Sequence, residues 1–93
     1  MALLFSWDPR KAESSQRKHG VSFPEATTAF ADPLSITIAD PDHSLGEQRF
    51  LLVGVTAVGR LVVVAHSGRG DEIRIITARP TTRHEREAYE EGT

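Results

Sequence analysis

The alternation of hydrophobic and polar residues is clearest between residues 71 and 79, near the end of the chain. Ile73 and Ile75 fall on one side of an extended backbone and Arg74 and Ile76 on the other, because successive side chains of a strand point in opposite directions. This period of two predicts a half-buried strand, with Arg74 on its more polar face.

Four further segments have the composition of strands, at residues 3–7, 34–38, 50–56 and 60–65. Leu61 to Ala65 is continuously apolar, which predicts a central strand that is covered on both faces. A tight turn at Val58-Gly59 and a second turn at residues 67–70 would join the last three strands as hairpins. The pattern predicts an antiparallel meander of four strands, to which residues 3–7 could add a fifth.

Capping signals predict three helices, over residues 9–19, 22–32 and 82–91. Asp8 is the expected N-cap of the first helix. Ser22 and Glu25 have the S/T-x-x-E spacing of a capping box, and Thr82 and Glu85 repeat it. Two helices before the sheet and one after it predict an α+β fold, formed by all 93 residues as a single domain.

Arginine side chains gather where the last predicted strand meets the last helix. Pro80 cannot donate to a strand ladder, so the strand should stop near Arg79. Arg83 and Arg86 follow in the first helical turn, and Arg74 lies a few residues upstream. Nine of the eleven basic residues are arginine, whose planar guanidinium pairs with phosphate or carboxylate through two parallel hydrogen bonds. A single surface arginine is usually solvated, but four near one corner indicate a function.

The overall charge is only −2 at pH 7, so no global positive field attracts nucleic acid or a membrane. Residues 1–47 carry four basic and seven acidic side chains (−3), whereas residues 48–93 carry seven and six (+1). The chain has no cysteine, no apolar segment long enough to span a membrane and an opening too short for a signal peptide. These features predict a cytosolic protein.

Neither a metal site nor a cofactor is expected. The four histidines lack the spacing of a zinc site. Asp40, Asp42 and Glu47 resemble part of a calcium loop, but Pro41 and the incomplete acidic pattern favour an ordinary turn. The glycine-rich residues 68–70 lie in a predicted hairpin rather than before a helix, so they lack the geometry of a phosphate-binding loop.

Five side chains near the arginine corner could cleave RNA without a metal: His66, Arg74, Arg79, Glu85 and Tyr89. One group would remove the 2′-hydroxyl proton, guanidinium groups would stabilise the phosphorane charge, and another group would protonate the leaving oxygen. Glu85 and Tyr89 are four residues apart and share a helix face. From spacing alone, a packed strand-end histidine is the commoner role for His66, and a core aromatic is as common for Tyr89.

The sequence resembles a known family through three segments: FSWDPRKAESSQRKHGVSFPEATTAFADPL, HSLGEQRFLLVGVTAVGRLVVVAH and IRIITARPTTRHEREAYE. Together they cover essentially the whole chain and are similar to the BrnT toxins of bacterial type II toxin–antitoxin modules. The resemblance implies a RelE-like fold and a ribonuclease activity that arrests translation. It also implies a neutralising antitoxin, BrnA, with a ribbon-helix-helix DNA-binding domain, in a 2:2 complex that represses its own operon.

The resemblance and the arginine corner together predict the site. Arg79 and Arg74 are expected to bind the phosphate and the transition state, with His66 and Tyr89 as candidates for proton transfer. The residues expected to contact RNA are Lys18, Arg83 and Glu85. Many ribonuclease toxins are basic and this chain is slightly acidic, so attraction of phosphate must be local to the corner. The alternative is a non-catalytic binding protein whose arginine corner docks an acidic partner.

Overall fold

The computed structural model describes residues 4–40 and 48–92. The elements are β1 (Leu4–Ser6), α1 (Pro9–His19), α2 (Phe23–Thr28), the 3-10 helix η1 (Ala29–Ala31), β2 (Ile36–Ala39), β3 (Arg49–Val55), β4 (Leu61–Arg69), β5 (Glu72–Pro80) and α3 (Arg83–Glu91). The predicted turn that contains Asp42 and Glu47 lies outside the described residues. None of the described helices is long and apolar enough to cross a membrane.

The five strands form one mixed sheet in the order β1-β5-β4-β3-β2. Antiparallel pairing of β2, β3, β4 and β5 confirms the predicted meander, and β4 is the central strand, as its apolar sequence indicates. The expectation of a purely antiparallel sheet was wrong for β1, which pairs in parallel with β5. A hairpin forces its strands to be antiparallel, but α1, α2 and three strands separate β1 from β5, so no turn sets its direction.

The two predicted turns differ in outcome. The turn between β3 and β4 forms at Gly59, which has a φ of 86° and donates its amide to the Thr56 carbonyl at 2.9 Å. The turn predicted at residues 67–70 was placed too early, because β4 continues to Arg69. The chain reverses at Gly70, whose φ of 60° is readily adopted by glycine.

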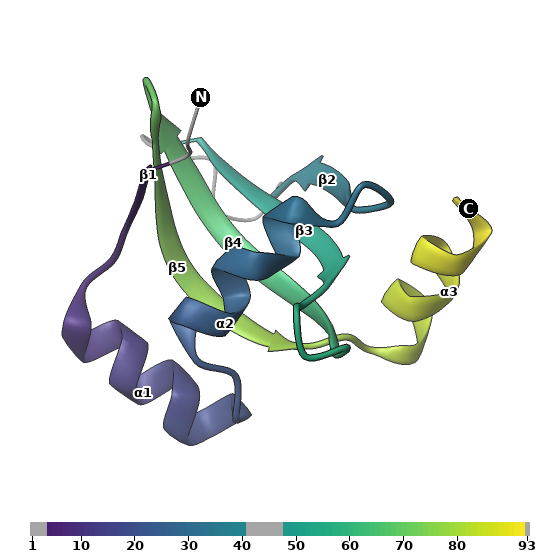
Figure 1. Cartoon of the computed structure of the whole chain (residues 1–93), viewed down its shortest axis with the longest axis horizontal. Coiled ribbons are helices and arrows are strands. Elements are labelled where there is room, and N and C mark those ends of the chain that lie inside the picture. The colour runs from purple at the N-terminus through teal and green to yellow at the C-terminus, as the bar shows by residue number, and fades with distance from the viewer. Residues whose placement is uncertain (1–3, 41–47, 93) are drawn as a thin grey trace.

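The two faces of the sheet differ in what covers them. Figure 1 shows α2 and η1 crossing one face, with α1 packed beside β5 and α3 beyond the end of that strand. The core between the helices and this face contains Val21, Phe23, Ala26, Ala29, Leu52, Val62, Val64, Ile75 and Ala78. Helix α3 has no fully buried residue. The opposite face carries neither α1 nor α2. Val53, Val63 and Ser67 on this face are buried, whereas Thr77 is exposed.

Helix α1 begins as predicted, with the Asp8 carboxylate accepting the Arg10 amide at 2.9 Å. It also completes an edge of the sheet. Strand β1 pairs with residues 72–74 of β5, so within residues 4–40 and 48–92 Ala78 has no strand neighbour on that side. The buried Ser15 hydroxyl donates to the Ala78 carbonyl and accepts the Ala78 amide, both at 3.2 Å. A serine side chain of α1 thus takes the place of a strand partner.

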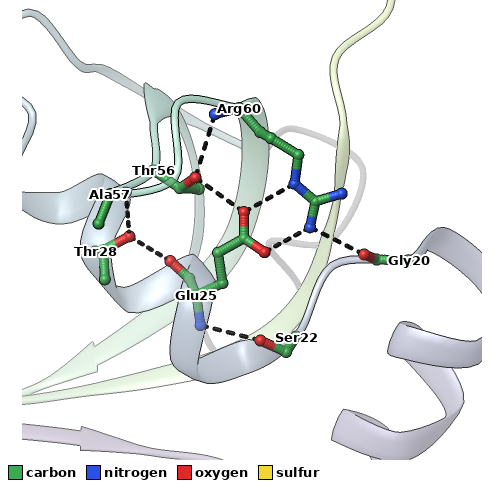
Figure 2. Close-up of polar contacts among 7 residues, drawn as sticks. All are labelled: Gly20, Ser22, Glu25, Thr28, Thr56, Ala57 and Arg60. Atoms are coloured by element: carbon green, nitrogen blue, oxygen red, sulfur yellow. Dashed lines mark hydrogen bonds and ion pairs between the residues drawn. The ribbon is translucent and has the colours of Figure 1, made fainter.

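Helix α2 has only the first half of its predicted capping box. The Ser22 hydroxyl accepts the Glu25 amide at 3.1 Å, but the Glu25 carboxylate instead accepts from Thr56 at 2.9 Å and pairs with Arg60 (Figure 2). Arg60 also donates to the Gly20 carbonyl at 3.0 Å. The hydrogen bond from Arg60 is the main reason that the pKa of Glu25 lies below its usual value. This network fastens the β3–β4 turn to α2.

Candidate functional site

A β-bulge in β5 decides which arginines share a face of the sheet. Ser67 of β4 lies opposite Arg74 and Ala65 lies opposite Thr77, so β4 advances by two residues while β5 advances by three. Arg74 and Arg79 are five residues apart and would point to opposite faces of a regular strand. The extra residue places both on the face opposite α2 and η1, which we call the arginine face.

The arginine face is built from rows of side chains that cross β3, β4 and β5. The rows are Arg49, Ser67 and Arg74, then Leu51, Ala65 and Thr77, then Val53, Val63 and Arg79. The Asp40 amide donates to the Arg49 carbonyl at 2.9 Å, which extends the first row toward β2. Sequence reasoning did not single out Arg49, because its place in the row of Arg74 depends on the register of three strands.

A hollow of about 300 Å³ opens on the arginine face. Asp40, Arg49 and Arg79 line it together with Thr77 and apolar side chains. Of the described residues that line this hollow, Asp40 is the only one with an acidic side chain. The hollow therefore combines guanidinium groups that can bind a phosphate with a carboxylate that can accept a proton.

Glu85 of α3 holds the Arg79 guanidinium. Nη1 and Nη2 of Arg79 donate to Oε1 and Oε2 of Glu85, each at 2.8 Å, and Nη1 also donates to the Pro80 carbonyl at 3.2 Å. The same carboxylate accepts the Thr82 amide at 2.8 Å, and the Thr82 hydroxyl accepts the Glu85 amide at 3.2 Å, which confirms this capping box. Hydrogen bonding from Arg79 is the main reason that the pKa of Glu85 falls to about 2.

The pairing with Glu85 leaves one edge of the Arg79 guanidinium available. An arginine has five N–H donors, and the bonds to Glu85 and Pro80 use three of them. Nε–H and the second N–H of Nη2 have no partner among residues 4–40 and 48–92, and the side chain is 33% exposed. Glu85 can therefore orient Arg79 while the free edge binds a phosphate through two hydrogen bonds.

His66 lies on the helix-covered face and not with Arg79. His66 is three residues along β4 from Val63, so the side chains of His66 and Val63 point to opposite faces of the sheet. Val63 lies opposite Arg79 and shares its face, which places His66 on the other face. Its ring packs edge to face against Phe30, with centroids 4.9 Å apart, and stacks on Phe50 at 5.9 Å. Burial lowers the pKa of His66, whose side chain contributes to the packing beneath η1.

Tyr89 and Glu85 both point from α3 toward the sheet, but they reach different partners. The Tyr89 hydroxyl donates to Oδ2 of Asp32 at 2.6 Å, and this bond is the main reason that its pKa is raised. Asp32 also accepts two backbone amides at 2.9 Å. Tyr89 therefore anchors α3 to the loop after η1, and it lines a different hollow, of about 470 Å³, together with Arg86.

Lys18 borders a third hollow, of about 330 Å³, between α1 and β5. Lys11 lies in the same hollow, and the hollow shares Ile76 and Thr77 with the one on the arginine face. The path that crosses β5 at Thr77 therefore has lysines of α1 at one end and guanidinium groups of the sheet at the other. The lysines are Lys11 and Lys18, and the guanidinium groups belong to Arg49 and Arg79. This path is a site feature that single motifs in the sequence do not reveal.

Arg83 lines neither of the two hollows that meet at Thr77. Its Nε donates to Glu87 at 3.1 Å on the outer surface of α3, and its side chain is 92% exposed. Arg17 and Glu13 form the same i,i+4 pair on α1. Such exposed pairs contribute about 0.3–0.5 kcal/mol to the stability of the fold. Arg83 can therefore leave Glu87 and bind a partner molecule at a small cost in free energy.

Residues 7–85 match the family described as "Ribonuclease toxin, BrnT, of type II toxin-antitoxin system". The chain belongs to the BrnT family. This confirms the resemblance seen in the sequence. The 1.1 Å crystal structure of the Brucella abortus ribonuclease toxin BrnT has a similar fold, with a TM-score of 0.63 at 16% identity, over 88% of this chain and 100% of that chain. No curated protein matches the sequence.

Proposed function

We propose that the arginine face is the catalytic site of an endoribonuclease toxin that cleaves RNA without a metal. Membership of a family of ribonuclease toxins supports the reaction class. The observation that carries the proposal is the bulge in β5, which brings Arg74 and Arg79 to one face beside a hollow that contains Asp40. The proposal includes a RelE-like architecture and one toxin domain over residues 1–93.

In the proposed reaction, the scissile phosphate binds to the free edge of Arg79. Arg74 and Arg49 bind the neighbouring phosphate oxygens. Asp40 accepts the proton of the 2′-hydroxyl, the 2′-oxygen attacks phosphorus, and the bond to the 5′-oxygen breaks. The products are a 2′,3′-cyclic phosphate and a 5′-hydroxyl, whose proton comes from solvent. Guanidinium groups aimed at the developing charge supply the main stabilisation, on the order of 3 kcal/mol for one lost donor.

This proposal revises the roles suggested for His66 and Tyr89. His66 packs between aromatic rings on the other face, so proton abstraction passes to Asp40, which shares the hollow with Arg79. Tyr89 acts as a positioning residue, because its bond to Asp32 holds the helix that carries Glu85. Glu85 in turn orients Arg79 rather than contacting RNA.

We place the flanking RNA along the path that crosses Thr77 toward α1. Lys18 and Lys11 line the hollow at that end and have no ionic partner among the described residues. Both can therefore bind phosphates on one side of the scissile bond. Local attraction of this kind suits a chain whose overall charge is −2.

The antitoxin in this proposal is BrnA-like and carries a ribbon-helix-helix domain. Toxin and antitoxin form a 2:2 complex that binds operator DNA. In this complex the toxin no longer arrests translation. Membership of a type II toxin family supports an antitoxin partner. The guanidinium groups of the arginine face can pair with antitoxin carboxylates. An exposed apolar side chain lies beside them: Ile38 is 54% exposed and lies opposite Leu51 of the middle row. An acidic amphipathic segment fits this combination and would block RNA by covering the face.

Induced expression of the toxin alone, with the antitoxin, and as the Arg79→Ala variant tests the proposed function. We expect growth arrest and new RNA ends only with the unpartnered wild-type toxin. Growth arrest without RNA cleavage would support the alternative, a non-catalytic protein whose arginines dock an acidic partner. Arrest and cleavage that persist in Arg79→Ala would instead place the catalytic site elsewhere.

A further inference from the structure

The first row of the arginine face continues onto β1. Ser6 lies opposite Arg74 in the parallel pairing of β1 with β5. Arg74 in turn lies opposite Ser67 of β4, which lies opposite Arg49 of β3. Residues directly opposite each other in a sheet present their side chains on the same face. Serine and arginine therefore alternate across four strands, and we call these four residues the serine–arginine row.

Both serines of this row have a buried hydroxyl without a hydrogen-bond partner. Oγ of Ser6 and Oγ of Ser67 are shielded from solvent, and neither bonds to another part of the described chain. Among the described residues, one further buried side-chain atom is in the same state, Oγ1 of Thr81. Burying a hydroxyl without a partner costs free energy, so two such groups on either side of Arg74 indicate a ligand that satisfies them.

The two arginines of the row keep their donors for a ligand. Arg49 and Arg74 are half-buried, and neither side chain forms a hydrogen bond or an ion pair within residues 4–40 and 48–92. Arginine and serine are both among the side chains that donate to phosphate oxygens in complexes with nucleic acids. A carboxylate, by contrast, is matched by one guanidinium through two parallel hydrogen bonds. The mixture of hydroxyl and guanidinium donors therefore favours a phosphate.

The serine–arginine row lies away from the position proposed for the scissile phosphate. Ser67 is four residues along β4 from Val63, which lies opposite Arg79, so about 13 Å of strand separates the two rows. Arg49 belongs to the serine–arginine row and also lines the hollow that contains Arg79. The row is therefore placed to hold a second phosphate of the same RNA strand while Arg79 holds the first.

We infer that the serine–arginine row binds an RNA phosphate that flanks the scissile one, with Ser6 and Ser67 donating hydrogen bonds to it. The inference rests on the proposed function and adds a second contact to the same substrate. Because both hydroxyls are shielded from solvent, the long side chains of Arg49 and Arg74 must move as the phosphate enters. The hydroxyls then exchange an unpartnered state for bonds to a charged oxygen, which stabilises the complex.

Binding of a short 2′-O-methyl RNA to the purified chain tests the inference, because an RNA without a 2′-hydroxyl proton cannot be cleaved by the proposed reaction. We expect Ser6→Ala and Ser67→Ala each to weaken binding about tenfold, since each loses a hydrogen bond to a charged group. Ser35→Ala is the control and should bind as the wild type does. Ser35 is half-buried like Ser6, but its Cβ lies close to Gly54 and to η1 on the helix-covered side.

Two further measurements separate phosphate binding from a structural role of Ser67. Ser67→Ala removes a hydroxyl that has no partner, so its urea midpoint should not fall, unlike that of Ser15→Ala. The slope of log affinity against log salt should be unchanged in Ser67→Ala, whereas Arg74→Gln, which loses a charge, should make it shallower by about 0.7. Lower stability of Ser67→Ala, or a shallower salt slope, would show that Ser67 only supports its neighbours and would overturn the inference.

A neutral methylphosphonate, introduced at one linkage of the RNA at a time, identifies the phosphate that Ser67 contacts. At one linkage beside the bond that the wild type cleaves in the unmodified RNA, Ser67→Ala should cause little further loss of affinity. The reason is that this linkage no longer offers the charged oxygen to which Ser67 donates. Losses that add at every linkage would show that Ser67 contacts no phosphate, and the inference would fail.

The remaining outcomes separate this inference from the proposed function. RNA cleavage by the wild type, together with unchanged RNA affinity in Ser67→Ala, would overturn the inference and leave the ribonuclease proposal intact. If Ser67→Ala weakened binding of the antitoxin but not of RNA, the row would bind antitoxin carboxylates instead of a phosphate. A wild-type chain that neither binds nor cleaves RNA would contradict the proposed function and the inference together.

Discussion

Arg74 and Arg79 share one face of the sheet although five residues separate them along a strand. The single extra residue is Ile76, because Ile75 pairs with His66 and Thr77 pairs with Ala65. Without this bulge the two guanidinium groups would lie on opposite faces, one of them against the core. The bulge is therefore the feature that creates the candidate site.

The first prediction concerns the bond that holds β5 just before Arg79. Ser15→Ala leaves the amide and carbonyl of Ala78 without their partner in a buried edge, which should lower the free energy of unfolding by about 1–3 kcal/mol. Ser14→Ala is the control, because Ser14 is the exposed neighbour on the same helix. Urea denaturation of both variants measures the difference, and equal stabilities would show that the Ser15 bond is dispensable.

The second prediction follows from the lowered pKa of Glu85. Its folded pKa of about 2 lies below the usual value of 4.5, so its contribution to stability is complete above about pH 4.5 and is lost as the pH falls toward 2. Glu85→Gln should cost about 2 kcal/mol at pH 7 and almost nothing at pH 2, because a charge-assisted hydrogen bond is lost only where Glu85 is ionised. Glu87→Gln, at a more exposed pair, should change little at either pH. If Glu85→Gln lowered the stability equally at pH 7 and pH 2, the ionised carboxylate of Glu85 would make no contribution to the stability of the fold.

Much of the fold could be predicted from local sequence, because its signals act over a few residues. The Thr82–Glu85 capping box, the Asp8 cap and the apolar central strand all form as expected. The parallel direction of β1 could not be predicted, since it is set by a contact between segments that are far apart in the sequence.

The candidate site was less predictable than the fold, because it depends on register. Residues 73–77 contain no glycine or proline that would mark a bulge, and their alternation favours a regular strand. The assignment of His66 to one face depends in the same way on the pairing of β4 with its neighbours. Arg79 itself was predictable, because Pro80 and the following cap fix the end of the strand beside a helix.

The third prediction tests the reassigned proton acceptor. Asp40→Asn should lower the single-turnover rate of RNA cleavage by about two to four decades, which is the usual contribution of a general base. His66→Phe should retain most of the rate, since the ring packs between Phe30 and Phe50. The opposite result, with His66→Phe inactive but folded by circular dichroism, would restore His66 as the base.

The fourth prediction concerns the antitoxin interface. Arg83→Glu should weaken antitoxin binding about tenfold or more, because the antitoxin is expected to place carboxylates around the arginine corner. Arg17→Glu is the matched control, since Arg17 also forms an exposed i,i+4 pair but lies on α1. Titration of both variants at fixed salt measures the effect. Equal affinities would place the interface away from α3.

The most direct measurement is cleavage of a single-stranded RNA in excess EDTA by the wild-type chain, Arg79→Ala and Arg17→Ala. We expect 2′,3′-cyclic phosphate or 3′-phosphate ends from the wild type and from Arg17→Ala. We also expect a rate about two decades lower for Arg79→Ala, since losing a transition-state guanidinium costs on the order of 3 kcal/mol. Cleavage that requires added Mg²⁺ and leaves 5′-phosphate ends, or an Arg79→Ala variant as active as the wild type, would contradict metal-free cleavage at Arg79.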